Sequence, residues 1–201
     1  MPPLNAKTDH LLVADFLEGE RESEIKHEYV EGQVFAMAGA SLWHNLLTGN
    51  LNGLLWNQLR DKPCFPVTGD MLLKTTKDRY RYPDLQIICD DDSSEDEYVR
   101  ENPVLIVEVL SRSTRRVDKT EKRAEYLAIE SVQEYVLIEQ DVAEIEIQRR
   151  RANWQPEYYY LGQDITFESV GITVSVQDIY QRVNNEDVVS YLRELQEASH
   201  S

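Results

Sequence analysis

Apolar and polar positions follow two regular patterns in the first third of the chain. Between residues 25 and 39, apolar residues alternate on both sides of Glu31 and Gly32, and this pattern predicts a β-hairpin with a glycine-containing turn. Between residues 41 and 60, leucines recur at the spacing of one helix face, at positions 47, 51, 54, 55 and 59. A long amphipathic helix is therefore expected directly after the hairpin.

Two further elements are predicted on either side of this hairpin and helix. The run DHLLVADFLEG predicts a short helix that is capped by Thr8 and ends at Gly19. Residues 66–75 and 82–89 are strand-like and flank the polar turn KTTKDR. We expect these two segments to pair as a hairpin.

The most hydrophobic run of the chain, residues 103–110, is nearly continuous in apolar side chains, which is typical of a central strand covered on both faces. Residues 118–130 contain good helix formers, and EYVLIE at 134–139 predicts another buried strand. A strand, a helix and a strand at this spacing form a crossover unit with parallel strands. Residues 143–149 alternate and are expected to pair back, which gives a mixed sheet.

The last part of the chain is predicted to add a final layer to the domain. It contains the strand-like segment GITVSV and two short helices that start at Gln177 and Asn185. The sequence shows no internal repeat and no low-complexity linker. With 201 residues, of which 41% are hydrophobic, the chain is long enough to bury a core. We therefore expect residues 1–201 to form one α/β domain.

The net charge and the distribution of charged residues exclude some classes of function. A formal net charge of -16 argues against a protein that coats nucleic acid with its whole surface. No apolar run approaches the roughly 20 residues of a membrane-spanning helix, and the N-terminus lacks a basic region followed by an apolar stretch, so a cytoplasmic protein without membrane contact is predicted. The acidic loop at 90–97 is followed by six basic residues between 112 and 123. These form either a local contact for a phosphodiester or a solvated helix face.

The two cysteines carry little chemical signal. Cys64 and Cys89 are isolated in apolar or turn-like surroundings, whereas zinc ligands usually occur in groups at short spacing. We interpret both as small buried hydrophobic residues and not as a disulfide or a zinc site.

Two acidic residues carry the candidate chemistry. Asp84 directly follows Pro83 at the start of an Ile-rich run, and Glu108 interrupts the most apolar strand. An ionised carboxylate taken out of water is costly unless it is paired or coordinates a metal. If both acids lie on neighbouring strands with their side chains on one face, they can share a divalent cation, because Mg²⁺ is usually held by one or two carboxylates plus water and substrate phosphate. The sequence therefore predicts a site for Mg²⁺, with Mn²⁺ as a substitute.

An Asp followed by a Glu in a later apolar strand resembles the PD-(D/E)XK nuclease superfamily, whose pattern ends in Glu, any residue and Lys. Here the triplet is Glu108, Val109 and Leu110, so the lysine is absent from the strand, and Lys122 stands on the following helix. Four segments strengthen the resemblance and point to the Uma2 family of proposed endonucleases: KHEYVEGQVFAMAGAS, YRYPDLQII, NPVLIVEVLSRSTRRVDKTEKRAEYLAI and QEYVLIEQ.

The resemblance implies a restriction-endonuclease-like fold, a mixed β-sheet flanked by helices, with a catalytic Mg²⁺ that serves phosphodiester hydrolysis. Asp84 and Glu108 are then metal ligands, the carbonyl of Val109 is a third ligand, and Lys122 replaces the strand lysine. The alternative for Lys122 is a surface ion pair with Asp118, four residues earlier, which would contribute only about 0.3 to 0.5 kcal/mol.

Four more residues are candidates for the same site. Glu28 and His44 match positions expected near the active site of this family, where a carboxylate holds a water of the metal and an imidazole moves protons or binds phosphate. Each is equally well explained as a polar residue that fixes a sheet edge or a helix. Asp70 is a further acidic candidate, and Tyr126 either hydrogen-bonds a ligand or packs against the sheet, with packing preferred.

The leading hypothesis is a Mg²⁺-dependent endonuclease that acts on nucleic acid, with DNA as the first substrate to consider. A homodimer is expected by analogy with enzymes that cut both strands. One alternative is a non-catalytic module on a nuclease scaffold that binds nucleic acid or protein. Another is a metal-assisted hydrolase of small phosphorylated substrates, since fold alone does not fix function.

Overall fold

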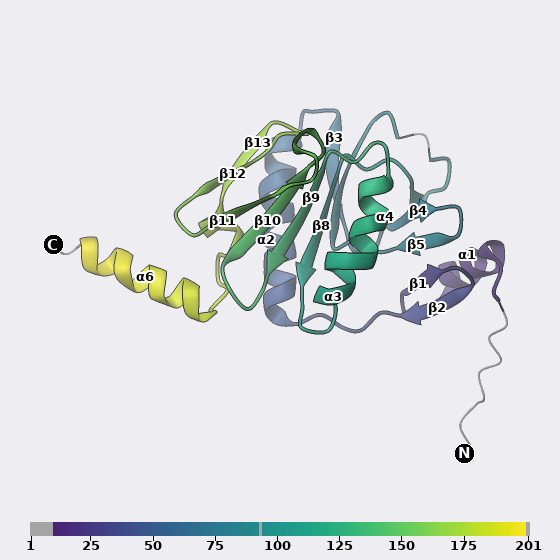
Figure 1. Cartoon of the computed structure of the whole chain (residues 1–201), viewed down its shortest axis with the longest axis horizontal. Helices are drawn as coiled ribbons and strands as arrows, with labels where there is room; N and C mark the ends of the chain where they lie inside the picture. The colour runs from purple at the N-terminus through teal and green to yellow at the C-terminus, as the bar shows by residue number, and fades with distance from the viewer. Residues whose placement is uncertain (1–9, 93, 200–201) are drawn as a thin grey trace, which may run out of the picture.

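The computed structural model describes residues 10–92 and 94–199. Its strands form a six-stranded sheet, a five-stranded sheet and a two-stranded ribbon, and helices flank the larger sheets (Figure 1). The predicted α/β class, with a mixed sheet flanked by helices, is confirmed.

The six-stranded sheet forms the centre of the molecule. Its order is β11 (Pro156–Tyr160), β10 (Glu144–Arg149), β9 (Glu134–Glu139), β8 (Leu105–Leu110), β6 (Leu85–Cys89) and β3 (Cys64–Thr68). Strands β8 and β9 are parallel, while the other neighbours are antiparallel. Every residue of β8 and β9 is buried. The prediction of a central strand and a crossover is thus confirmed.

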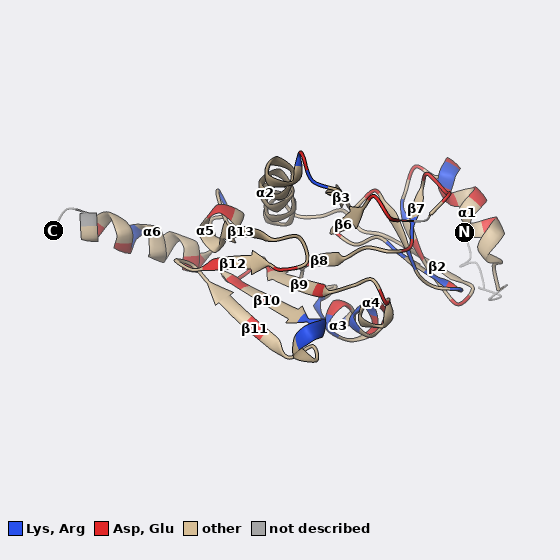
Figure 2. Cartoon of the chain, turned by 90° about the horizontal axis from the view of Figure 1, so that it is seen from above, with Lys and Arg blue, Asp and Glu red and all other residues tan. Residues whose placement is uncertain are grey.

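Helices cover both faces of this sheet (Figure 2). Helix α2 (Leu42–Leu59) buries Leu47, Leu51 and Leu55 against one face, and the side chain of Ser41 caps it by accepting the backbone N–H of His44 at 3.1 Å. The other face is covered by α3 (Arg115–Val117), a π-helical turn η1 (Asp118–Lys122) and α4 (Arg123–Ala128). Both predicted helical regions are confirmed, and the π-helical turn is an addition.

The five-stranded sheet lies beside the central one. Its order is β2 (Gln33–Ala36), β1 (His27–Val30), β5 (Arg79–Arg81), β4 (Leu72–Thr76) and β7 (Val99–Arg100). The turn between β1 and β2 places Glu31 and Gly32 at positive φ, and the glycine adopts φ 88° without steric cost. The predicted hairpin is therefore confirmed.

The first helix differs from its prediction. Helix α1 runs over Val13–Glu22, so Gly19 lies inside it and does not end it. The predicted cap, Thr8, lies outside the described residues. The apolar face of α1 buries Phe16 against Tyr29 and Tyr80, and this tertiary packing offsets the low helix propensity of a single glycine.

The segment 66–75 is also divided differently from the prediction. It forms the end of β3 and the start of β4, which belong to different sheets and are separated by a turn at Gly69 and Asp70. Strand β3 pairs with β6, whereas β4 pairs with the short strand β5. The two predicted segments do pair, but the hairpin across the polar turn is the one between β4 and β5.

The interpretation of the cysteines is wrong. Cys64 and Cys89 are opposite each other in the register of β3 and β6, and their sulfur atoms form a disulfide. Directly opposed residues on antiparallel strands lie close together, and the two Cα atoms are 3.9 Å apart although the cysteines are 25 residues apart in the sequence.

The C-terminal part continues the six-stranded sheet and adds a small layer. A short 3₁₀ turn, η2 (Arg150–Ala152), precedes β11, and β12 (Asp164–Phe167) pairs with β13 (Ile172–Ser175). Of the two predicted short helices, α5 (Val176–Ile179) is short, but α6 (Glu186–Ser199) has 14 residues and extends away from the body (Figure 1). Within the described residues, no helix has the length and apolar character needed to cross a membrane.

Candidate active site

Glu108 lies on β8, in the middle of the central sheet, and is 3% exposed. Its Oε1 accepts a hydrogen bond from the hydroxyl of Tyr126 at 2.8 Å and lies 3.1 Å from Nζ of Lys122. Both partners come from the helical segment that covers this face of the sheet. Tyr126 is fully buried and stacks edge-on with Tyr135, so its ring packs as predicted while its hydroxyl holds the carboxylate.

Asp84 immediately precedes β6, next to the strand that carries Glu108. The last pair of this antiparallel ladder is Leu85 with Val107. Continuing its register by one residue brings Asp84 opposite Glu108, and Asp84 accordingly contributes to the raised pKa of Glu108. Side chains opposed in this way project from the same face. Sequence reasoning had required this arrangement of the two acids.

The contacts of Asp84 differ from those of Glu108. Its Oδ2 accepts the backbone N–H of Val109 at 2.7 Å and lies 3.1 Å from Nε2 of His44. His44 comes from the first turn of α2, which covers the opposite face of the sheet. Val109 therefore contacts the site through its N–H, whereas the prediction concerned its carbonyl. Asp84 and His44 are partly exposed, with side-chain exposures of 18% and 16%, so this side of the site is open to solvent.

Lys122 lies at the end of the π-helical turn and is 7% exposed. Its Nζ is 3.0 Å from Oε1 of Glu28, 3.1 Å from Oε1 of Glu108 and 3.5 Å from Oδ1 of Asp118. The surface ion pair that spacing alone suggested is therefore wrong, because the amine is buried and Asp118 is the most distant of its three partners. π-Helical turns occur frequently at functional sites, and this one points an amine toward the carboxylates.

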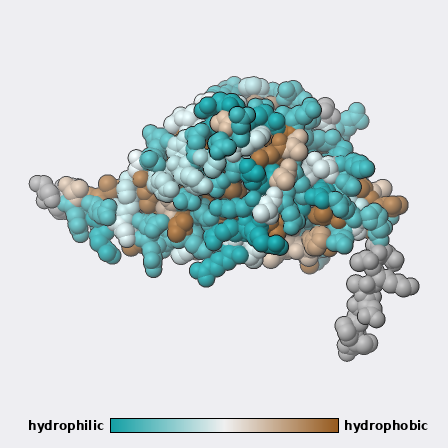
Figure 3. Space-filling view, in the orientation of Figure 1, coloured by the Kyte–Doolittle hydropathy of each residue, from teal (hydrophilic) through white to brown (hydrophobic). Residues whose placement is uncertain are grey.

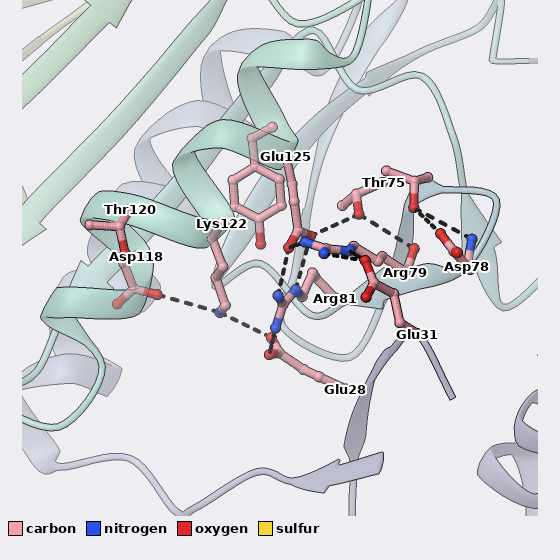
Figure 4. A network of polar contacts seen from close by, with 12 residues as sticks. Glu28, Glu31, Thr75, Asp78, Arg79, Arg81, Asp118, Thr120, Lys122 and Glu125 are labelled. Carbon is pink, nitrogen blue, oxygen red and sulfur yellow. Dashed lines mark hydrogen bonds and ion pairs between the residues drawn. The ribbon is translucent and has the colours of Figure 1, made fainter. Parts of the chain in front are cut away.

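A second layer of charges supports Glu28 and was not predicted. Arg81, 3% exposed, contacts Oε2 of Glu28 through Nη1 at 2.8 Å, and its Nη2 and Nε contact Glu125 at 2.6 and 3.0 Å. Arg79 contacts the same Glu125 at 2.8 Å. Figure 4 shows this network running from Asp118 through Lys122 and Glu28 to Arg81 and Glu125. It fixes Glu28 between a lysine and an arginine.

A weak signal for this network does exist in the sequence. Arg79 and Arg81 alternate on one face of a short strand, and Glu125 lies three positions after Lys122 on the helix. Both patterns are also typical of solvated surfaces. Only the packing of helix α4 against the five-stranded sheet makes these charges partners.

The electrostatics of the cluster show an excess of negative charge. Burial raises the pKa of Glu108 well above its ordinary value; Lys122 opposes this, while Asp84, Asp118 and Glu28 raise the pKa further. Burial also raises the pKa of Asp118. For Lys122, burial favours the neutral amine, but Glu108, Glu28 and Asp118 outweigh burial, and its pKa is raised. The amine is therefore charged, whereas Glu108 is held in a place that favours a proton or another cation.

The residues present fit a divalent cation. Among the described residues, no three His, Cys, Asp or Glu side chains form a ready metal cage. Mg²⁺ needs only one or two carboxylates, and Asp84 and Glu108 would supply two hard oxygen ligands. Oδ1 of Asp118 is buried and, apart from its ion contact with Nζ of Lys122 at 3.5 Å, has no hydrogen-bond partner among the described residues. The donor set suits Mg²⁺ or Mn²⁺ better than a softer metal.

Two predicted features lie outside this cluster. Asp70 is exposed and forms an ion pair with Lys26 at 2.7 Å. The basic run after Glu108 is largely paired with acids of β9, β10 and the turn between them. Arg112 contacts Asp141, Arg115 contacts Glu139 and Asp141, and Lys119 contacts Glu139 and Glu146. Much of its charge is thus neutralised within the chain.

Comparison with known proteins identifies the fold and the family of this chain. A solved structure, "Crystal structure of a putative nuclease belonging to DUF820" from Anabaena variabilis ATCC 29413, matches with a TM-score of 0.72 at 15% identity, covering 85% of this chain and 98% of that one. The α/β fold is therefore shared with this solved structure.

Two proteins from Synechocystis sp. (strain ATCC 27184 / PCC 6803 / Kazusa) are similar in sequence. "Uncharacterized protein sll1609" is 37% identical over 138 residues, covering 67% of this chain and 78% of that protein. "Uncharacterized protein slr1290" is 28% identical over 170 residues, covering 83% and 90%. The model of the family described as "Uma2: Putative restriction endonuclease" matches residues 13–177. The match extends over most of the chain and contains Glu28, His44, Asp84, Glu108 and Lys122, and the chain belongs to the Uma2 family.

Proposed function

We propose that this protein is a metal-dependent endonuclease that hydrolyses phosphodiester bonds of nucleic acid at the cluster of Asp84, Glu108 and Lys122. The observation that carries the proposal is the closeness of two acids, Asp84 directly before β6 and Glu108 on the adjacent β8, where Asp84 helps to raise the pKa of Glu108, together with a buried, charged lysine amine 3.1 Å from Glu108. An internal ion pair that served stability alone would not need three carboxylates around one lysine.

The cation belongs at Asp84 and Glu108. Bound there, Mg²⁺ or Mn²⁺ would polarise the scissile phosphate and make water more acidic. Lys122 keeps a positive charge in a poorly hydrated place, where it stabilises negative charge that develops on the phosphate oxygens. Glu28 and Arg81 hold this amine in position.

His44 is the residue that we propose for proton transfer. Its Nε2 lies 3.1 Å from Oδ2 of Asp84, a contact that favours the tautomer with the proton on Nε2 and leaves Nδ1 as an acceptor. At Nδ1 the ring can take up a proton, while Asp84 fixes its orientation. The partly exposed edge of the site at His44 is where substrate and water enter.

One observation favours a second function. The basic run after Glu108 is paired with acids of the same chain, and the net charge is -16, so little positive surface remains to hold a duplex backbone. A non-catalytic interaction module would be compatible with this surface. The buried carboxylates weigh against it, because such a module has no use for an unbalanced charge inside its central sheet.

The two functions are separated by a cleavage assay with purified protein. Supercoiled DNA, single-stranded DNA and RNA are incubated with Mg²⁺, with Mn²⁺ and with a chelator. We expect cleavage that requires a divalent ion and disappears with the chelator. If no substrate is cut under any of these conditions, the interaction module becomes the better account. Gel filtration with light scattering of the same preparation tests the proposed homodimer, and fractionation of the source cells tests the proposed cytoplasmic location.

Metal binding is testable without the right substrate. Asp84→Asn removes one of the two proposed ligand charges, and we expect titration calorimetry to show Mn²⁺ affinity at least about tenfold weaker than in the wild type, since even outer partners of a metal site change affinity by roughly 10- to 100-fold. Asp70→Asn is the matched control, because it removes an exposed carboxylate outside the cluster. Equal affinities of the two variants would show that Asp84 is not a ligand.

A further inference from the structure

One exposed aromatic side chain lies in the same row of the sheet as the site. Phe35 on β2 pairs directly with Glu28 on β1, and Arg81 on β5 contacts Glu28 and pairs with the buried Leu73 on β4. Paired residues on neighbouring strands share one face. The row therefore begins in the core at Leu73, passes through Arg81 and Glu28 in the site, and ends at Phe35.

Phe35 is 49% exposed although it is large and apolar. It belongs to β2, the outer strand of its sheet, in which every residue is exposed. Figure 3 shows apolar side chains among hydrophilic ones over the end of the molecule where β1 and β2 lie. Among the described residues, no strand pairs with the outer side of β2. The ring of Phe35 is therefore available to a ligand over its exposed half.

The segment that follows Phe35 borders the open side of the site. Residues 36–42 read AMAGASL, have no charged side chain and are exposed except for the half-buried Met37. They lead to His44, and Ser41 donates its hydroxyl to Gln140 just after β9 at 2.7 Å. In Figure 1 this segment passes below the ends of β8 and α3. Ligands of sheets with parallel strands bind outside the carboxyl ends of those strands.

We propose that Phe35 is a stacking platform for an unpaired base, and that the substrate class of this nuclease site is single-stranded nucleic acid. The inference rests on the proposed function for its location, since the stacked base would belong to the strand that enters the site at His44. Aromatic side chains stack on any base, because every base has a π-face. The bases of an intact duplex are stacked on one another and do not offer that face.

The charge distribution supports a single strand over a duplex. Binding to a duplex backbone depends on Lys and Arg that neutralise phosphates, and Arg115 and Lys119 near the site are already paired with Glu139. A single strand can gain affinity from stacking instead. An uncharged, small-residue border such as 36–42 lets sugars and bases approach closely.

The test compares Phe35→Ala, Phe35→Trp and Val34→Ala. Val34 is the matched control, because it is the preceding residue on the same strand, is 42% exposed and points to the opposite face. Fluorescence anisotropy with a labelled 12-nucleotide single-stranded DNA, the same RNA sequence and the corresponding DNA duplex is measured with a chelator, so that no cutting occurs. A 2-aminopurine in the single strand reports stacking directly.

We expect Phe35→Ala to weaken binding of either single strand roughly 5- to 100-fold and to restore 2-aminopurine fluorescence, because each base stacked on an aromatic ring contributes that much. Phe35→Trp and Val34→Ala should both bind within about threefold of the wild type. Unchanged binding by Phe35→Ala, an equal loss in Val34→Ala, or tighter binding of the duplex than of the single strands would each overturn the proposal. Loss of a dimer in Phe35→Ala, seen by light scattering, would also overturn it, since β2 would then be an interface. The assay does not need cleavage, so it is read independently of whether the protein cuts.

Discussion

Glu108→Gln is expected to reduce metal-dependent cleavage by at least about 100-fold, because a direct ligand should matter more than outer partners, whose loss costs roughly 10- to 100-fold. The same change is expected to make the protein more stable at neutral pH. Glutamine keeps an oxygen that accepts from the hydroxyl of Tyr126, but it removes a buried charge that Asp84, Asp118 and Glu28 repel. Lys122 keeps Glu28 and Asp118 as partners, and each unit by which the fold raises the pKa of Glu108 corresponds to about 1.4 kcal/mol that the ionised carboxylate costs and glutamine does not.

The pH dependence of this gain has a defined direction. The folded protein raises the pKa of Glu108 above its ordinary value of 4.5, so the folded state binds the proton more tightly than the unfolded chain. This contribution to stability is fully present below the ordinary pKa and is lost as pH rises through the raised pKa. Glutamine cannot lose a proton. The stability difference between the variant and the wild type should therefore be small near pH 4 and grow toward neutral pH.

Chemical denaturation at several pH values measures this difference, and the cleavage assay is run on the same samples. Glu134→Gln is the control, because Glu134 is also buried in the central sheet but is paired with Arg149 at 3.0 Å and lies outside the cluster. It should lose stability and keep cleavage. If Glu108→Gln cut as fast as the wild type, Glu108 would not be a ligand; if it were less stable at neutral pH, the excess of negative charge would not exist.

The candidate site stands out in the sequence because its central residue is charged and its neighbours in the strand are apolar. A glutamate in the strand LIVEVL has no structural explanation without a cation, and the strands on either side have strong local patterns. Helix α2, the β1–β2 hairpin and the crossover from β8 to β9 were predicted correctly because each depends on periodicity within a short segment. Which residues these elements bring together then depends on the register of a few strand pairs.

The missed features depend on contacts between distant segments. Arg81 is one of two arginines in a short polar stretch, and its burial against Glu28 and Glu125 exists only once β1 pairs with β5 and α4 packs on that sheet. The disulfide joins Cys64 to Cys89 because β3 pairs with β6 in one register, and a shift by one residue would separate them. The division of 66–75 into two strands likewise depends on which partner each half finds.

Lys122→Met is expected to abolish detectable cleavage and to destabilise the protein by about 3 to 5 kcal/mol at neutral pH, because removing one partner of a buried ion pair leaves charges without compensation. Glu28 and Glu108 would then face each other with only Arg81 nearby. The loss should shrink as pH falls, since protonation of these carboxylates removes their repulsion. In the wild type the pKa of Lys122 is raised, so the amine stays charged through the whole neutral range. Its stabilising charge is lost only at strongly alkaline pH.

The double variant Lys122→Met with Glu108→Gln separates stability from activity. Since it removes one charge of each sign, it should recover most of the stability lost in Lys122→Met and still cut nothing. Lys119→Met, on the same helical segment and half-exposed beside Glu139 and Glu146, should change stability by about 1 kcal/mol or less and keep cleavage. Cleavage by the double variant would remove Lys122 from the chemistry, and the buried amine would then serve only to balance the acids that surround it.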